Sequence, residues 1–261
     1  MSFLDHLEEL RWHLIRSFAA ILVFAIAAFI FKDIIFDRII LAPKLPGFYT
    51  NRMLCKLGDL VNAPVLCINS EPLNIINIKM SGQFTTHIVI SIVAGFILGF
   101  PYLIYELWRF IKPALYKNER RHARGGIYYT SFLFFIGVLF GYYIIVPLSV
   151  QFLGTYSVSE EVTNQIDLKS YISIVTSVSL ASGIIFELPV LVYFLSKTGL
   201  VTPRFLRKYR KHSIIAILIL SAIITPPDIF SQVLVCVPLL LLYEVGIVIS
   251  KRIEKKQELA G

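Results

Sequence analysis

The stretch GIIFELPV, residues 183–190, places one glutamate, Glu187, in the middle of an apolar segment that runs from residue 171 to residue 195. An apolar segment of ~20 residues can cross the hydrocarbon core of a bilayer as an α-helix. An ionisable side chain inside such a helix is costly and generally marks a function, although a bond to a polar side chain of the same bundle is the structural alternative. The stretch therefore predicts a membrane helix with a polar site at its centre.

Five more apolar segments predict that the whole chain is an integral membrane protein. Hydrophobic residue types make up 56% of the 261 residues and the mean hydropathy is +0.73. Charged residues make up only 16%, against ~25% in soluble domains. We predict a single all-α membrane domain over residues 1–261, with no cleaved signal peptide and with six transmembrane helices at residues 12–31, 82–105, 126–150, 171–195, 212–225 and 230–250.

The last two predicted spans are short. About fourteen residues separate Lys211 from the break TPPDIFSQ, residues 225–232, and they would form a helix of ~21 Å. The hydrocarbon core is ~30 Å thick. We therefore expect the turn of this hairpin to lie within the depth of the membrane.

The segments that flank the first span predict two further elements. Phe3, Leu4, Leu7, Leu10 and Leu14 share one helical face, which is typical of an amphipathic helix at the membrane interface. Residues 32–81 mix prolines and other turn formers with short apolar runs, and predict an irregular outer cap. This cap carries Cys55 and Cys67. A disulfide between them is our hypothesis, but the spacing leaves two free thiols equally open.

The distribution of basic residues predicts the orientation. Eighteen of the 25 lysine and arginine residues lie near the N-terminus, between residues 106 and 124, between residues 197 and 211, or after residue 250. Basic residues favour the cytoplasmic side, so both termini are expected in the cytoplasm. The net charge of +8 is then explained by attraction to anionic lipid rather than by nucleic-acid binding.

The polar residues do not form a catalytic set. The sequence has no serine-hydrolase, zinc-protease or nucleotide-loop motif, and its scattered histidines, among them His6 and His13, are expected at surfaces or interfaces. We therefore expect no enzyme activity, no metal and no cofactor. Two carboxylates, Glu9 and Glu119, stand on an otherwise basic face. Taken alone, each would be expected to exchange charge with neighbouring residues.

Six motifs together resemble the TatC family, the multi-spanning core of the twin-arginine protein translocase. They are SFLDHLEELR at residues 2–11, LAP at 41–43, WRFIKPALYKNERR at 108–121, FELPV at 186–190, TPPDIFSQ at 225–232 and PLLLLYE at 238–244. They cover the whole chain in the family's order. Only the cap segment 48–70 is longer than we expect for the family.

The resemblance implies a cup-shaped fold and a function in protein export across the bacterial inner membrane. Family members bind signal peptides that carry two consecutive arginines, act with small TatA- and TatB-type subunits, and export folded proteins with the proton-motive force; we also expect self-association. Glu9 and Glu119 correspond to the acidic residues that recognise the arginine pair. The other implied positions are Arg11, Phe110 and Pro113 around that surface, Glu187 on the concave face, and Pro43, Asp228 and Gln232.

Physical chemistry agrees with the implied role of the two acidic residues. A guanidinium group binds carboxylates through paired hydrogen bonds, and a basic background would repel cations that lack such a partner. This changes our interpretation of Glu119 from a surface charge to a recognition residue. The alternative function is a secondary transporter or channel that uses Glu187 as a proton or substrate site.

Overall fold

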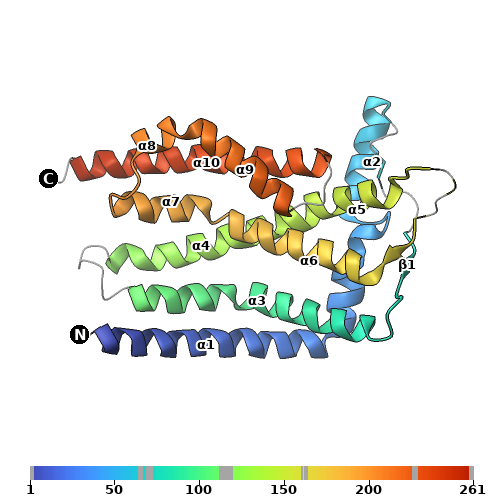
Figure 1. The fold of residues 1–261 in the computed structure, drawn as a ribbon, viewed down its shortest axis with the longest axis horizontal. Helices are drawn as coiled ribbons and strands as arrows, with labels where there is room; N and C mark the ends of the chain where they lie inside the picture. Colours follow the sequence, from blue (N-terminus) through green and yellow to red (C-terminus); the bar gives the residue numbers. More distant parts are fainter. Residues whose placement is uncertain are drawn as a thin grey trace.

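The computed structural model describes residues 3–63, 67–68, 73–111, 120–159, 161, 164–224 and 229–258. The protein is an all-α membrane protein in which long helices lie side by side (Figure 1). Its helices are α1 (Phe3–Ile30), η1 (Asp33–Ile40), η2 (Ala42–Lys44), α2 (Tyr49–Val61), α3 (Gly82–Ile111), α4 (Arg120–Phe140), η5 (Gly141–Ile145), α5 (Val146–Thr155), α6 (Leu168–Ile185), α7 (Leu188–Lys197), α8 (Pro203–Lys208), α9 (Arg210–Ile224) and α10 (Ile229–Glu258).

Helix lengths agree with the predicted spans. Within the described residues, four helical stretches are long and apolar enough to cross a membrane: Glu8–Ile30, Gly82–Phe110, Gly125–Thr155 and Leu168–Lys197. The fifth predicted span is α9, whose 15 residues reach only ~22 Å, and the sixth lies within α10. Figure 1 shows both termini at the same end of the bundle, as an even number of passes requires.

The first two spans pack closely because glycines on α3 face α1. A Cβ on Gly95 would lie 2.6 Å from the backbone nitrogen of Ala25, and a Cβ on Gly99 would lie 3.0 Å from the side chain of Ile21. Small residues of this kind allow two membrane helices to approach along their backbones. The contact aligns the N-terminal end of α1 with the C-terminal end of α3.

Prolines shape the third and fourth spans. The ring of Pro189 is incompatible with a helical carbonyl at Ile185, and α6 ends at that residue, three positions before α7 begins. Pro147, in the first turn of α5, likewise lacks the amide that would bond the carbonyl of Tyr143. The hydroxyl of Thr50 donates to this carbonyl instead, which attaches α2 to the third span.

The described residues between the first two spans form a cap. It contains the π-helix η1, the short turn η2 and the 13-residue α2, and α2 crosses the ends of the spans (Figure 1). A disulfide bond joins Cys55 to Cys67. A two-residue parallel pairing of β1 (Ile75–Ile76) with β2 (Ile166–Asp167) ties the end of the cap to the start of α6. The cap is therefore more regular than its composition suggested.

Two other boundaries differ from the prediction. The N-terminal amphipathic stretch is helical, but it continues into the first span as one helix, α1, instead of turning at the interface. The second span continues past residue 105 to Phe110. This extension moves Glu106, which we had assigned to the following loop, into α3, where 1% of its surface is exposed.

Candidate functional site

Two stripes of polar and aromatic residues face each other at the end of the bundle that carries the N-terminus. Glu9, His13 and Ser17 are spaced by four residues on α1, and Tyr102, Glu106 and Phe110 have the same spacing on α3. Residues four apart lie on one side of a helix. Because α1 and α3 pack along their lengths, the two stripes meet.

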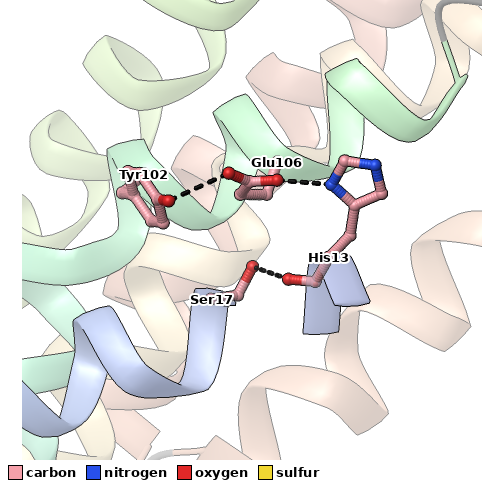
Figure 2. A network of polar contacts seen from close by, with 4 residues as sticks. All are labelled: His13, Ser17, Tyr102 and Glu106. Carbon is pink, nitrogen blue, oxygen red and sulfur yellow. Dashed lines mark hydrogen bonds and ion pairs between the residues drawn. The ribbon is translucent and has the colours of Figure 1, made fainter. Parts of the chain in front are cut away.

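A buried pair, His13 and Glu106, joins the stripes (Figure 2). Nδ1 of His13 donates to Oε2 of Glu106. The hydroxyl of Tyr102 donates to Oε1 of the same carboxylate at 2.9 Å, and Ser17 donates to the carbonyl of His13 at 2.9 Å. Both carboxylate oxygens therefore have a partner, and the rings of Phe110 and His13 form a T-shaped contact, with 6.0 Å between ring centres.

This pair is the principal feature that sequence reasoning missed. His13 was expected at a surface or an interface and Glu106 in a loop, yet their exposed fractions are 6% and 1%. A buried carboxylate without a partner would cost several kcal/mol, and His13 and Tyr102 supply the partners. The spacing of four residues from Glu9 to His13, and from Tyr102 to Glu106, was the available signal.

The predicted recognition residues are only partly brought together. Glu9 is half-buried and lies one turn before His13 on the stripe that faces α3. Phe110 contacts His13 from the other helix. Arg11 is exposed, and its offset of two residues from Glu9 places it on a different side of α1. Pro113 and Glu119 lie outside the described residues.

The carboxylate of Glu187 lies inside the bundle, at the break between α6 and α7. Glu187 is the N-cap residue of α7, and its backbone carbonyl accepts a hydrogen bond from the amide of Leu191 at 3.0 Å. Both side-chain oxygens are shielded from solvent and have no hydrogen-bond partner among the described residues. Because both oxygens are shielded, the carboxylate points inward.

Glu187 stands at one end of a seam of unsatisfied polar atoms between α4 and α6. In the described part of the chain, the hydroxyls of Thr130, Ser179 and Ser182 are also buried without a hydrogen-bond partner. A Cβ on Gly141 of η5 would lie 2.8 Å from the Ser182 hydroxyl, which shows how closely this segment approaches α6. Buried polar groups are normally satisfied, so unsatisfied ones are unusual in a contact packed this closely.

The remaining predicted residues have separate roles. The side-chain amide of Gln232 donates to the carbonyl of Leu218 at 3.3 Å, so it ties α10 to α9 and does not bond to Glu187. Asp228 lies outside the described residues. Pro43 is buried in the cap, where its carbonyl accepts from Asn51 at 3.1 Å.

Glu244 of α10 forms an ion pair with Arg210 of α9 at 2.5 Å. No group of three or more histidine, cysteine, aspartate or glutamate residues in the described ranges could hold a metal ion.

Comparisons with known proteins agree with the motifs. A family model described as "Sec-independent protein translocase protein (TatC)" matches residues 5–238. A relative from Blattabacterium sp. subsp. Periplaneta americana, named Sec-independent protein translocase protein TatC, is 42% identical over 98% of this chain and 97% of its own length. A relative of the same name from Aquifex aeolicus is 36% identical over 99% of this chain and 98% of its own length.

Solved structures give the same result. A crystal structure titled as the twin-arginine translocase receptor TatC matches with a TM-score of 0.70 and 34% identity, over 95% of this chain and 99% of that one. A second crystal structure of that receptor, in DDM, has a TM-score of 0.73 and 35% identity, over 93% and 98% of the two chains. These matches do not favour the alternative of a secondary transporter.

Proposed function

The chain belongs to the TatC family of Sec-independent protein translocase proteins, and from this premise we propose that it is the signal-peptide receptor and the core of a twin-arginine translocase. It takes folded proteins whose signal peptides carry two consecutive arginines. Its partners are small single-span subunits of the TatA and TatB type, and it also associates with itself. The proton-motive force drives transport.

The observation that supports receptor function best is the position of Glu9. This carboxylate is half-buried on the helix face that the His13–Glu106 pair holds against α3. A partly shielded carboxylate binds a guanidinium group more strongly than a fully hydrated one, because the local dielectric is lower. The buried pair thus keeps Glu9 in place before the peptide arrives, which reduces the entropy lost on binding.

We assign the second carboxylate of the receptor to Glu119. It follows the C-terminal end of α3 in the sequence, and that end lies against the N-terminal end of α1. Phe110 contributes an aromatic face beside His13, on which a guanidinium group can stack. We also assign Pro113 to the recognition surface, and the exposed Arg11 repels cations that lack a carboxylate partner.

Location follows from the charge distribution. We place the protein in the bacterial inner membrane, with both termini and the recognition surface in the cytoplasm. The basic residues Arg109, Lys197, Arg207 and Lys251 belong to helix ends or loops on the side of the termini. An excess of basic residues on one side is typical of the cytoplasmic face.

We assign Glu187 to docking within the membrane. The carboxylate points inward in this structure, so a partner helix or an inserted signal peptide reaches it only when the side chain turns outward. No hydrogen bond to its side chain opposes that rotation within the described residues. A polar group on the incoming helix would then satisfy the carboxylate, which is a stabilising interaction inside a membrane.

Binding of a twin-arginine peptide to the purified protein in detergent tests the receptor assignment. We expect the Glu9→Gln and Glu119→Gln variants each to lose about tenfold or more in affinity, because each removes a charge-assisted hydrogen bond. Glu8→Gln is the matched control: Glu8 is exposed and adjacent to Glu9, and its variant should bind normally. A peptide with two lysines should bind more weakly to the unmodified protein.

Two results would contradict the assignment. The first is unchanged affinity of the Glu9→Gln, Glu119→Gln double variant. The second is equal affinity for the arginine and lysine peptides. Export of a folded reporter with a twin-arginine signal, in cells that lack the endogenous protein, then tests whether the receptor also supports transport.

A further inference from the structure

A large apolar cavity lies between the cap and the spans, and neither the His13–Glu106 pair nor Glu187 lines it. Its volume is about 850 Å³, within the range of ~300–1,000 Å³ that is typical of sites for small organic ligands. Its walls come from α3, α4 with η5, and α6, and its roof from η1, η2 and α2. Ile90 and Ile97 of α3, Val138 of α4 and Val175 of α6 are representative of the walls.

The polar groups of the walls are not presented to the cavity. Thr176 donates its hydroxyl to the carbonyl of Ile172 at 2.7 Å. The hydroxyl oxygen of Ser179 is shielded from solvent, and its helix faces Gly141 at this position. An occupant of the inner part therefore meets hydrocarbon side chains and no hydrogen-bonding group.

The roof end has the opposite character. Arg38 of η1 and Arg52 of α2 both line the cavity and are exposed, and neither has an ion pair within the described ranges. Tyr49 and Tyr143 line the same end. Tyrosine is enriched where the hydrocarbon core meets the headgroups, and arginine binds phosphate through paired hydrogen bonds.

The cavity is preformed, because several bonds fix its roof to the spans. The hydroxyl of Tyr142 donates to the carbonyl of Ile39 at 2.6 Å, and that of Tyr171 donates to the carbonyl of Ile40 at 2.8 Å. The ring of Phe48 stacks on Tyr143, with 5.4 Å between centres. A roof attached in this way does not have to be ordered when a ligand binds.

The cavity has a hydrocarbon-facing margin. Leu98 of α3 and Leu139 of α4 line it and are half-exposed, with 51% and 52% of their surfaces accessible. Both belong to membrane spans, so the exposed parts of these side chains face acyl chains when the protein is in a bilayer. A lipid can therefore enter from the side without crossing the cap.

We propose that this cavity binds one anionic phospholipid, with an acyl chain against the apolar walls and the phosphate between Arg38 and Arg52. Charge complementarity selects this occupant: the apolar part ends at a pair of guanidinium groups, as a lipid ends at its phosphate. A membrane-spanning helix fits less well, because residues of η2 and α2 line the end of the cavity through which such a helix would have to continue.

Native mass spectrometry of the delipidated protein in detergent tests this proposal. Phosphatidylglycerol is the anionic probe, and phosphatidylcholine of the same chain length is the zwitterionic one. We expect a phosphatidylglycerol adduct that Arg38→Gln, Arg52→Gln weakens about tenfold or more, from the strength of charge-assisted hydrogen bonds. Lys56→Gln, Lys79→Gln is the control, since it removes two exposed charges outside the cavity.

A second variant tests the apolar part of the site. Ala94 lines the cavity from α3, and Ala94→Phe fills it without changing charge. We expect this variant to lose the adduct while both arginines remain. Leu139→Trp at the open margin should slow lipid entry. If Ala94→Phe does not fold, Leu139→Trp takes its place, and its phosphatidylglycerol adduct should be reduced. Elution of a monodisperse protein from size exclusion identifies the folded variants.

Three results would overturn the proposal. They are equal binding of the two lipids, binding that does not respond to the loss of both arginines, and binding that persists when the cavity is filled. If a photocrosslinker at Ala94 captures a twin-arginine peptide and phosphatidylglycerol does not bind, the cavity is a peptide site and the lipid assignment is wrong.

Discussion

Removal of His13 should destabilise the protein far more than removal of an exposed charge. In His13→Ala, the Glu106 carboxylate, of whose surface only 1% is exposed, keeps a single hydrogen bond, from Tyr102 at 2.9 Å. Loss of one partner of a buried ion pair costs ~3–5 kcal/mol, mainly because the other charge is left uncompensated. We expect a loss of about this size in the free energy of unfolding, and a similar loss for Glu106→Ala.

Replacement of both partners should behave differently. In His13→Leu, Glu106→Leu no charge remains to be compensated, and buried pairs replaced by apolar residues are often neutral in stability. We expect this double variant to lie within ~1 kcal/mol of the unmodified protein. The coupling energy of the double-mutant cycle, with both single Leu variants included, should therefore exceed ~3 kcal/mol.

Denaturation in detergent micelles, followed by circular dichroism, measures these free energies. The exposed pair of Arg210 and Glu244 is the control: 58% and 44% of the two side chains are accessible, so its removal should cost at most ~1 kcal/mol. Twin-arginine peptide affinity should fall in the single His13 and Glu106 variants and recover in the double Leu variant. The role of the pair would be refuted if each single variant lowered the free energy of unfolding by less than ~1 kcal/mol. It would also be refuted if the losses of the two single variants added up to the loss of the double variant.

Three further predictions concern other parts of the molecule. Glu187→Ala should leave folding intact, because neither carboxylate oxygen has a hydrogen-bond partner within the described residues, but should abolish reporter export; normal export would remove Glu187 from the mechanism. Gly95→Ala should cost ~1–3 kcal/mol by overpacking α1 against α3, whereas Gly125→Ala, with nothing within 4 Å of the added Cβ, should not destabilise; equal unfolding free energies would contradict the close approach. Thiol titration of the denatured, unreduced protein should find one free thiol, Cys236, because Cys55 and Cys67 are joined; a count of three would contradict the disulfide.

The roles of prolines show where sequence patterns were insufficient. The break TPPDIFSQ predicted a short fifth span, and α9 has 15 residues, because two adjacent prolines cannot continue a helix. Pro147 and Pro189, in contrast, lie within apolar segments that we predicted as single spans. Each of these prolines leaves a backbone carbonyl without its helical partner. Whether another group bonds such a carbonyl, as Thr50 of α2 bonds that of Tyr143, depends on which helix lies beside it.

The amino-acid sequence by itself determined that this protein is an all-α membrane protein, where its spans lie and which family its motifs match, because hydrophobic length and residue spacing are local properties of the chain. Only the tertiary structure decided that His13 and Glu106 form a buried pair, that the Glu187 carboxylate points inward, and that Arg38 and Arg52 line one apolar cavity. The physical reason is that burial and pairing are properties of helix contacts. His13 and Glu106 are 93 positions apart, and only the packing of α1 on α3 removes both from water.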